Sequence, residues 1–280
     1  MNIRDITDHH QYPGWLMQRP RWIYLHYFFL WFFFLRSRIC RRAIKGLLKN
    51  LEDRNNFILD AGCGEGQYLI PFATRFPGLH FTGIDILPDH IDFLNNLAAK
   101  EGLQNCTFSV EDLESHLPDS RPYSLIYIIG VLQYVSDPAG VIELAHRSQT
   151  DGGQLMVYTP LDAGIEFGFY RYIRNKYGHY DDARSRYKAI HRSDLDDWIH
   201  QAGYRIVTER PHYGYLASLG HQMMQSLMML ITAWKGILKV IPVLFFIILM
   251  PIFVPLQIVE TWIRPTSRSR YNGLLLILQK

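Results

Sequence analysis

The sequence is poor in cysteine and has almost no excess of charge. Its three cysteines, Cys40, Cys63 and Cys106, form no CxxC pair, so we expect neither a disulfide framework nor a metal site. Lysine and arginine number 29 against 26 acidic residues, a net charge of +3, which gives no general case for a nucleic-acid partner. Residues 1–20 are polar and include acidic side chains, so no signal peptide is expected. These absences favour a globular protein of a reducing compartment.

Aromatic side chains, in contrast, are abundant and make up 14% of the 280 residues. Hydrophobic residues reach 48% and charged residues 20%, which is the composition of a globular chain that can bury a core. The length fits one domain with insertions or two small domains. The aromatic residues gather mainly in three segments, 22–34, 166–192 and 215–265.

The middle of the chain alternates short apolar runs with amphipathic stretches, which predicts strands joined by helices. An apolar run such as Tyr123–Ile129 is typical of a central parallel strand that is covered on both faces. The pattern therefore predicts an α/β fold with a doubly wound, mostly parallel sheet. The expected strands are Phe57–Asp60, His80–Ile84, Cys106–Val110, Tyr123–Ile129, Gln154–Tyr158, Tyr204–Glu209 and Gly273–Gln279, and the expected helices are Gln67–Phe76, Pro88–Glu101, Asp137–Thr150 and Ser193–Ala202, the last opened by Ser193 with Asp196 in its cap.

A glycine-rich segment, DAGCGEG at residues 60–66, follows the first expected strand and precedes a helix. Glycines there let the backbone approach a ligand, and the helix N-terminus offers free N–H groups. Asp85 follows Gly64 by about 20 residues at the end of the next strand, a spacing that suits a carboxylate bound to ribose hydroxyls. A nicotinamide dehydrogenase would carry GxGxxG instead. Here Asp60 would repel a pyrophosphate and suits a cationic ligand.

Together these features resemble the class I S-adenosylmethionine-dependent methyltransferases. Five segments match that family in order over roughly residues 57–160: ILDAGCGEGQY, FTGIDI, FSVEDLE, YSLIYIIGVLQYVSDP and GGQLMVYTP. The tail HRSDLDDWIHQAGYRIV…NGLLLILQK continues the match. The resemblance implies a seven-stranded, mostly parallel sheet of the class I methyltransferase fold. It also implies S-adenosylmethionine as the cofactor and S-adenosylhomocysteine as the product.

The resemblance also assigns roles to nine residues of the cofactor site. By position in these motifs, the amino-acid end of the cofactor would be lined by Asp60, Gly62 and Gly64, the ribose and adenine by Asp85 and Ile86, the adenine edge by Asp112 and Leu113, and the methionine part by Gly130 and Val131. One departure is visible, because many relatives have Glu-His where this chain has Gln133-Tyr134. If that histidine assists the chemistry in relatives, this chain uses another group or none.

Candidate catalytic residues follow from the acceptor side of the sheet. A hydroxyl acceptor benefits from a general base, whereas a basic amine needs little more than loss of its proton. Tyr134, Tyr158, His179 and His191 are the candidates for that base. The alternatives are that His191 is a surface residue near a helix start and that Tyr134 is a wall of the pocket. The sequence does not distinguish O-, N- and C-methylation.

Two segments are apolar enough to meet a membrane. Trp22–Leu35 spans about 14 residues, which is short for a crossing, and its Trp and Tyr favour the membrane interface. The alternative is a helix packed over the cofactor. Val240–Val259 spans about 20 residues with Gln257 as the only polar side chain, enough to cross a bilayer core. Prolines, including Pro251 and Pro255, are expected to kink it.

Topology restricts how the second segment can meet a bilayer. If Gly273–Gln279 is the last strand, residues 215–270 are an insertion between two neighbouring strands. Both ends of the insertion then return to the same side of the membrane, so a single crossing is excluded. A re-entrant or interfacial helix pair is favoured. A two-pass hairpin and a soluble cap or dimer interface are the alternatives.

The predicted function is methyl transfer from S-adenosylmethionine to a lipophilic or membrane-embedded acceptor, such as a lipid head group, a quinone-type lipid or an aryl lipid. The expected location is the cytoplasmic face of the inner (plasma) membrane, with a monotopic or re-entrant attachment; no oligomeric state is predicted. The alternatives are a soluble methyltransferase of a polar acceptor such as a sugar, and a non-catalytic cofactor-binding subunit. The expected parts are N-terminal membrane-associating helices (1–50), a methyltransferase core (51–214 and 271–280) with an acceptor lid (161–192), and the apolar insertion (215–270).

Overall fold

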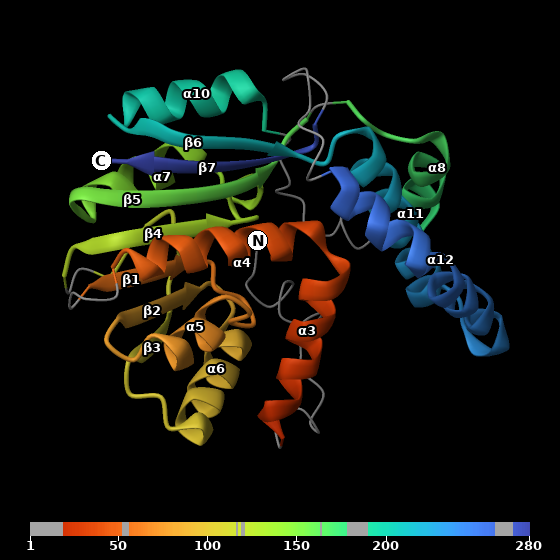
Figure 1. Ribbon diagram of the computed structural model, residues 1–280, viewed down its shortest axis with the longest axis horizontal. Helices are drawn as coiled ribbons and strands as arrows, with labels where there is room; N and C mark the ends of the chain where they lie inside the picture. The colour runs from red at the N-terminus through yellow and green to blue at the C-terminus, as the bar shows by residue number, and fades with distance from the viewer. Residues whose placement is uncertain are drawn as a thin grey trace.

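The fold is built on one seven-stranded sheet, seen in a computed structural model that describes residues 19–51, 56–115, 117–118, 121–162, 164–177, 190–260 and 271–280 (Figure 1). The strand order is β3-β2-β1-β4-β5-β7-β6, and only β7 is antiparallel to its neighbours. The predicted class I methyltransferase fold is therefore confirmed. The strands are β1 Phe57–Ala61, β2 His80–Asp85, β3 Cys106–Val110, β4 Tyr123–Ile129, β5 Gln149–Pro160, β6 Arg205–His212 and β7 Gly273–Gln279.

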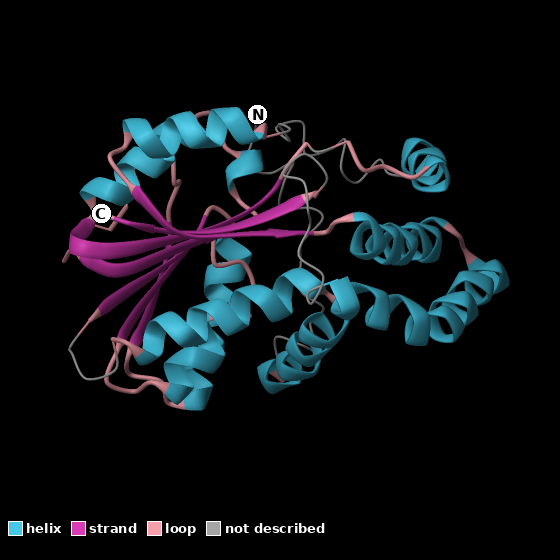
Figure 2. Ribbon diagram, turned by 45° about the horizontal axis from the view of Figure 1, so that its top comes forward, coloured by secondary structure: helices cyan, strands magenta, loops and turns pink. Residues whose placement is uncertain are grey.

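Helices cover both faces of the sheet (Figure 2). Apolar side chains of α4 (Leu35–Lys49) and α5 (Leu69–Arg75) form one buried cluster with the sheet, and those of α7 (Pro138–Arg147) and α10 (Arg192–Gln201) form the other. A third cluster joins α6 (Pro88–Glu101) to α3 (Ile23–Phe33). The central strands carry apolar side chains on both faces because both faces are covered.

Several predicted boundaries were wrong, among them those of α7, β5 and α10. α7 ends at Arg147 rather than Thr150, and β5 already begins at Gln149, whose backbone pairs with Tyr123. The Gly152–Gly153 pair lies within the strand, beside an irregularity in its register, so it does not mark the turn into the strand. α10 begins at Arg192, with His191 at the N-cap position and no side-chain cap from Ser193. The Ser193 hydroxyl instead contacts the neighbouring Asp194 carboxylate.

The insertion between β6 and β7 is a helical hairpin of α11 (Tyr215–Ala233), η3 (Gly236–Lys239) and α12 (Val240–Glu260). α12 continues through Pro251 and Pro255, although a proline inside a helix removes a backbone hydrogen bond and clashes with the preceding turn. The hairpin extends from the carboxyl edge of the sheet, and α11 lies between α12 and α8 (Gly168–Tyr177) (Figures 1 and 2). The apolar helix predicted before the last strand is therefore present.

Candidate active site

In the glycine-rich loop after β1, Gly62 lies so close to a neighbouring side chain that no other residue fits there without displacing it. Gly62 has a φ of +82°, and a Cβ there would lie 2.4 Å from the Cγ2 of Val131. Its N–H and that of Cys63 both donate to the Ile84 carbonyl at 2.8 Å. The loop is thus held against the end of β2, with its backbone exposed to the space above the sheet.

An open cavity of about 320 Å³ lies at the carboxyl ends of the parallel strands. This is the edge where doubly wound sheets bind their ligands. The cavity brings together eight of the nine residues expected to hold the cofactor: Gly62, Gly64, Asp85, Ile86, Asp112, Leu113, Gly130 and Val131. Residues that the sequence did not single out also line it, among them His90 and Glu111. Of the predicted catalytic residues that the structure describes, Tyr134 lines the cavity, and Tyr158 and His191 do not.

Asp85 is fixed at the end of β2 by backbone donors. Its Oδ2 accepts from the Gly64 N–H at 2.8 Å, and its Oδ1 accepts from the Leu87 N–H at 2.9 Å. The Nδ1 of His90 lies 3.6 Å from Oδ1. Burial raises the pKa of Asp85, but His90 and the two N–H groups outweigh it, so the pKa lies below its usual value. The carboxylate is therefore ionised and oriented toward the cavity, as a partner of ribose hydroxyls must be.

Asp60, near the end of β1, is the one residue expected to hold the cofactor that does not line the cavity, and it is only 2% exposed. Its Oδ2 has no hydrogen-bond partner among the described residues. Burial, followed by the charge of Asp85, raises its pKa well above the usual range, and a neighbouring Tyr127 hydroxyl only partly opposes this. An ionised Asp60 is thus costly unless a positive charge comes close. The site fits a cationic ligand group at this point.

The N-terminal helix α3 closes over the glycine-rich loop. The Tyr27 hydroxyl donates to the Glu65 carbonyl, and the His26 Nε2 lies 3.2 Å from a Glu65 carboxylate oxygen. Tyr27 is fully buried, whereas the next residue, Phe28, points to another side of the helix and is 59% exposed. One side of α3 therefore packs over the glycine-rich loop, which agrees with the alternative predicted from the sequence. Another side of the helix exposes apolar aromatic rings.

Arg36, on the first turn of α4, lies next to one residue of the cavity lining, although the sequence did not single it out as a site residue. Its Nη1 lies 3.0 Å from the position a Cβ would take at Gly130, a residue of the cavity lining. It forms no ion pair with a carboxylate among the described residues. Burial lowers the pKa of Arg36, but the nearby hydroxyls of Tyr68 and Tyr158 outweigh this and leave it raised. In the sequence, Arg36 is one of several arginines after an apolar run, so no signal separated it from them.

Two other predicted catalytic residues do not line the cavity. Tyr158 is 3% exposed and belongs to the buried cluster between α4 and the sheet, where burial raises the pKa of its hydroxyl well above the usual value. His191 is exposed beside α10, with its Nδ1 4.0 Å from an Asp162 carboxylate oxygen. His179 lies outside the described residues. Catalytic roles for Tyr134, Tyr158 and His191 thus stay predictions, and only Tyr134 is at the cavity.

The comparison with known proteins agrees with this geometry. Residues 52–192 match the methyltransferase domain family. A ubiquinone biosynthesis O-methyltransferase of Coxiella burnetii is 25% identical over 171 residues, 59% of this chain and 70% of that protein. One from Xylella fastidiosa is 30% identical over 103 residues, 36% and 41% of the two chains.

A solved structure shares the fold. Coclaurine N-methyltransferase, bound to N-methylheliamine and S-adenosylhomocysteine, superposes with a TM-score of 0.55 at 10% identity, covering 86% of this chain and 72% of that one. The family match at residues 52–192 covers just over half of the chain. With the cofactor cavity at the expected sheet edge, the chain belongs to the methyltransferase domain family and is an S-adenosylmethionine-dependent methyltransferase.

Proposed function

We propose that this protein methylates a lipophilic acceptor that it takes from a membrane surface. The observation that carries the proposal is an exposed apolar surface formed by α12 and the outer side of α3, a helix that also contacts the glycine-rich loop of the cofactor site. The location on the cytoplasmic face of a membrane is part of the same proposal.

The cofactor-binding residues provide orientation and charge. Bound S-adenosylmethionine supplies a methyl group on a positively charged sulfur, already activated for transfer. Asp85 would hold the ribose hydroxyls and Asp60 a cationic group of the amino-acid end. Arg36, beside Gly130, would pair with the carboxylate of that end. The loop contacts of α3 limit the access of water to this end of the cavity.

The α12 surface is too apolar to face water without a partner. The most apolar stretch within Gly236–Val259 has a mean hydropathy of 2.8, and only 17% of that stretch is buried. Leu244, Ile248 and Ile252 follow one another at every fourth position and are 52%, 66% and 54% exposed. Soluble proteins rarely expose apolar patches of this kind except where they bind a partner or a membrane.

α3 extends the same surface. The rings of Phe29 and Phe33 contact Phe246 of α12, with centroids 6.5 and 6.0 Å apart. Their neighbours Phe28 and Phe32 are 59% and 45% exposed. Exposed aromatic rings next to an apolar helix are typical of proteins that lie in the membrane interface.

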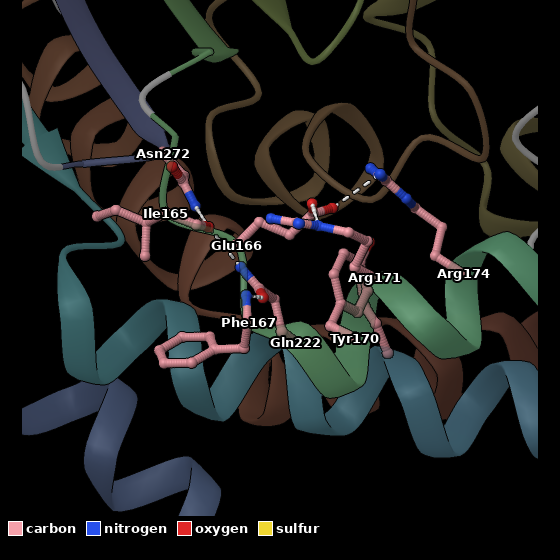
Figure 3. A network of polar contacts seen from close by, with 9 residues as sticks. Ile165, Glu166, Phe167, Tyr170, Arg171, Arg174, Gln222 and Asn272 are labelled. Carbon is pink, nitrogen blue, oxygen red and sulfur yellow. Dashed lines mark hydrogen bonds and ion pairs between the residues drawn. The ribbon is translucent and has the colours of Figure 1, made fainter.

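A polar network on the other side of α11 favours a hairpin that lies along one leaflet over one that spans the bilayer (Figure 3). Glu166 pairs with Arg171 at 2.7 Å and with Arg174 at 2.8 Å, both on α8. Gln222 of α11 accepts from the Phe167 N–H at 2.9 Å and donates to the Ile165 carbonyl at 2.7 Å. These hydrogen bonds hold the start of α8 against α11. If α11 and α12 crossed the bilayer, Glu166, Arg171 and Arg174 would enter the hydrocarbon core, which is costly for charged side chains.

The similar proteins support the choice of acceptor. Those from Coxiella burnetii and Xylella fastidiosa are named ubiquinone biosynthesis O-methyltransferases. A quinone-type or aryl lipid carries the hydroxyl that such an enzyme methylates and the apolar tail that a membrane retains. The acceptor we propose belongs to this class.

Polar substitutions on the exposed stripe of α12 test the proposal. The variant Leu244→Gln/Ile248→Gln/Ile252→Gln removes three side chains that are about half exposed. Each is worth about 1.5–3 kcal/mol when fully buried, so membrane binding should weaken by about 3–5 kcal/mol. We expect the variant to fold and to bind S-adenosylhomocysteine normally. It should neither float with lipid vesicles nor methylate an acceptor embedded in them.

The matched control places glutamine at exposed apolar residues far from this surface. Ile206→Gln/Val207→Gln, on the edge strand β6, alters side chains that are 38% and 49% exposed and should leave vesicle binding unchanged. Full flotation of the α12 variant would contradict the proposal. So would a wild-type protein that stays with the supernatant as a dimer whose interface is this stripe.

A further inference from the structure

One extended residue, Phe34, separates α3 from α4. At this junction two backbone N–H groups at the start of α4 need hydrogen-bond acceptors from elsewhere in the protein. Phe34 is extended there, with φ of −106° and ψ of 119°, and its side chain gives α4 no cap. The first N–H groups of a helix have no partner within it. For α4 these include the N–H groups of Leu35 and Arg36, and Arg36 is the residue whose guanidinium reaches Gly130.

Both donors are taken by side chains from the far end of the sequence. The Leu35 N–H donates to the Oε1 of Gln257 on α12 at 3.2 Å, and the Arg36 N–H donates to the Tyr213 hydroxyl at 3.1 Å. Gln257 is 0% exposed and Tyr213 is 6% exposed. Tyr213 also has a φ of +58°, a backbone conformation that is uncommon and costly for a bulky residue.

Packing within the hairpin does not explain a glutamine at position 257. Among the described residues, the Nε2 of Gln257 donates only to the sulfur of Met224, at 3.2 Å, which is a weak acceptor. The surrounding cluster is apolar and includes Phe253 and Val254 of α12. An apolar side chain would suit this cluster better, because a buried amide is costly unless it is hydrogen-bonded. Its hydrogen bond to α4 is therefore the contact that accounts for it.

We propose that Gln257 is a positioning residue, through which the α11–α12 hairpin fixes the first turn of α4 and places Arg36 against the cofactor. The proposal rests on the pairing of Arg36 with the cofactor carboxylate. Under this proposal the α11–α12 hairpin supports the cofactor site, in addition to forming the surface that meets the acceptor. Gln257, the only polar side chain of the apolar stretch Val240–Val259, then has a function in ligand binding.

A double-mutant cycle on the full-length protein tests this, with S-adenosylhomocysteine affinity measured by calorimetry. We expect Arg36→Ala and Gln257→Leu each to raise the Kd about tenfold or more. In the double variant, Gln257→Leu should add less than a twofold change, because Arg36 is the group through which it acts. A purely structural effect of Gln257 would persist in the Arg36→Ala background.

Two further variants control for folding. Gln257→Glu keeps an oxygen acceptor at the α4 N-terminus, where negative charge is favourable, and should bind within about threefold of wild type. Met224→Leu removes the other contact of Gln257 and should leave the Kd unchanged. Circular dichroism melting identifies any variant that fails to fold.

The outcomes separate this inference from the proposed cofactor contact. If Arg36→Ala leaves the Kd unchanged, the carboxylate pairing is wrong, and the role of Gln257 fails with it. If Arg36→Ala weakens binding but Gln257→Leu does not, only the positioning role is overturned. Independent, multiplying effects in the double variant would overturn it as well.

Discussion

Replacing Asp60 with asparagine should change protein stability and cofactor affinity in opposite directions. The carboxylate is expected to destabilise the ligand-free fold and to strengthen binding of S-adenosylmethionine. The side chain is 2% exposed, and its Oδ2 has no partner among the described residues. Asparagine keeps the shape and removes the charge. An unsatisfied buried polar group costs about 1–3 kcal/mol, and more when charged, so we expect the ligand-free variant to gain at least about 1 kcal/mol at neutral pH. That gain corresponds to a rise in Tm of about 2–4 °C.

The gain should depend on pH in a defined direction. The pKa of Asp60 is raised in the folded state, so the folded protein binds more protons than the unfolded chain, and stability falls as pH rises above about 3.9, the ordinary carboxyl pKa. Below about pH 3.9 the carboxyl is protonated in both states. The stability advantage of Asp60→Asn should therefore vanish there and grow as the pH rises.

Cofactor binding should change in the opposite direction. Loss of a charge-assisted contact to a cationic group costs about 1.5–3 kcal/mol, which is a rise in the Kd for S-adenosylmethionine of roughly 10- to 150-fold. Thermal melts of the ligand-free protein over a pH series and calorimetry at neutral pH measure the two effects. A variant that is less stable at neutral pH and binds S-adenosylmethionine as tightly as wild type would refute the reasoning.

Three other substitutions test the site more briefly. Gly62→Ala forces a Cβ toward Val131 at a positive φ, so it should destabilise the protein by about 1–2 kcal/mol and weaken S-adenosylhomocysteine binding tenfold or more in calorimetry; unchanged affinity would argue against close approach of the ligand. Asp85→Asn leaves either the Gly64 or the Leu87 N–H without an acceptor and should raise the same Kd at least tenfold, whereas a normal Kd would exclude the ribose contact. His191→Ala alters an exposed side chain away from the cavity, so kcat should stay within about twofold, and a hundredfold loss would place His191 at the acceptor.

The sheet could be predicted almost completely from the sequence because its signals are local. β3, β4 and β7 have the predicted bounds, since β4 and β7 are short apolar runs and β3 alternates apolar with polar residues, both of which are typical of strands. α6 also has its predicted bounds, and Gly102 ends it in the left-handed conformation at φ of +68°. The start of β5 was missed because its first residues, near Gln149, are polar and pair with a neighbouring strand across a register shift. Such pairing is a tertiary effect that periodicity does not reveal.

Much of the cofactor site was also accessible from sequence, because it is built from residues directly after strand ends. Gly62, Asp85 and Gly130 follow this rule and line one cavity. Arg36 does not follow this rule, because its guanidinium reaches Gly130 from a helix more than 20 residues before the glycine-rich loop. Its neighbour Leu35 is held by Gln257, a contact 222 residues apart in the chain. No local pattern encodes a contact over that separation.

The position of a residue relative to a strand did not suffice to predict which catalytic candidates line the cavity. Tyr134 and Tyr158 both follow or end central strands, but only Tyr134 lines the cavity. Tyr158 points into the cluster between α4 and the sheet, where it packs with apolar neighbours. Side chains alternate between the two faces of a strand, so one residue of register decides whether a polar group meets a ligand or the core.

The most direct test of the central claim follows the labelled methyl group. The protein is incubated with S-adenosylmethionine labelled in that group and with vesicles made from the lipid extract of its source cells. We expect the label to appear in the organic phase of a subsequent lipid extraction, with wild type and the β6 control but not with the α12 variant. Label transferred only to a water-soluble product, at equal rates with and without vesicles, would contradict the account.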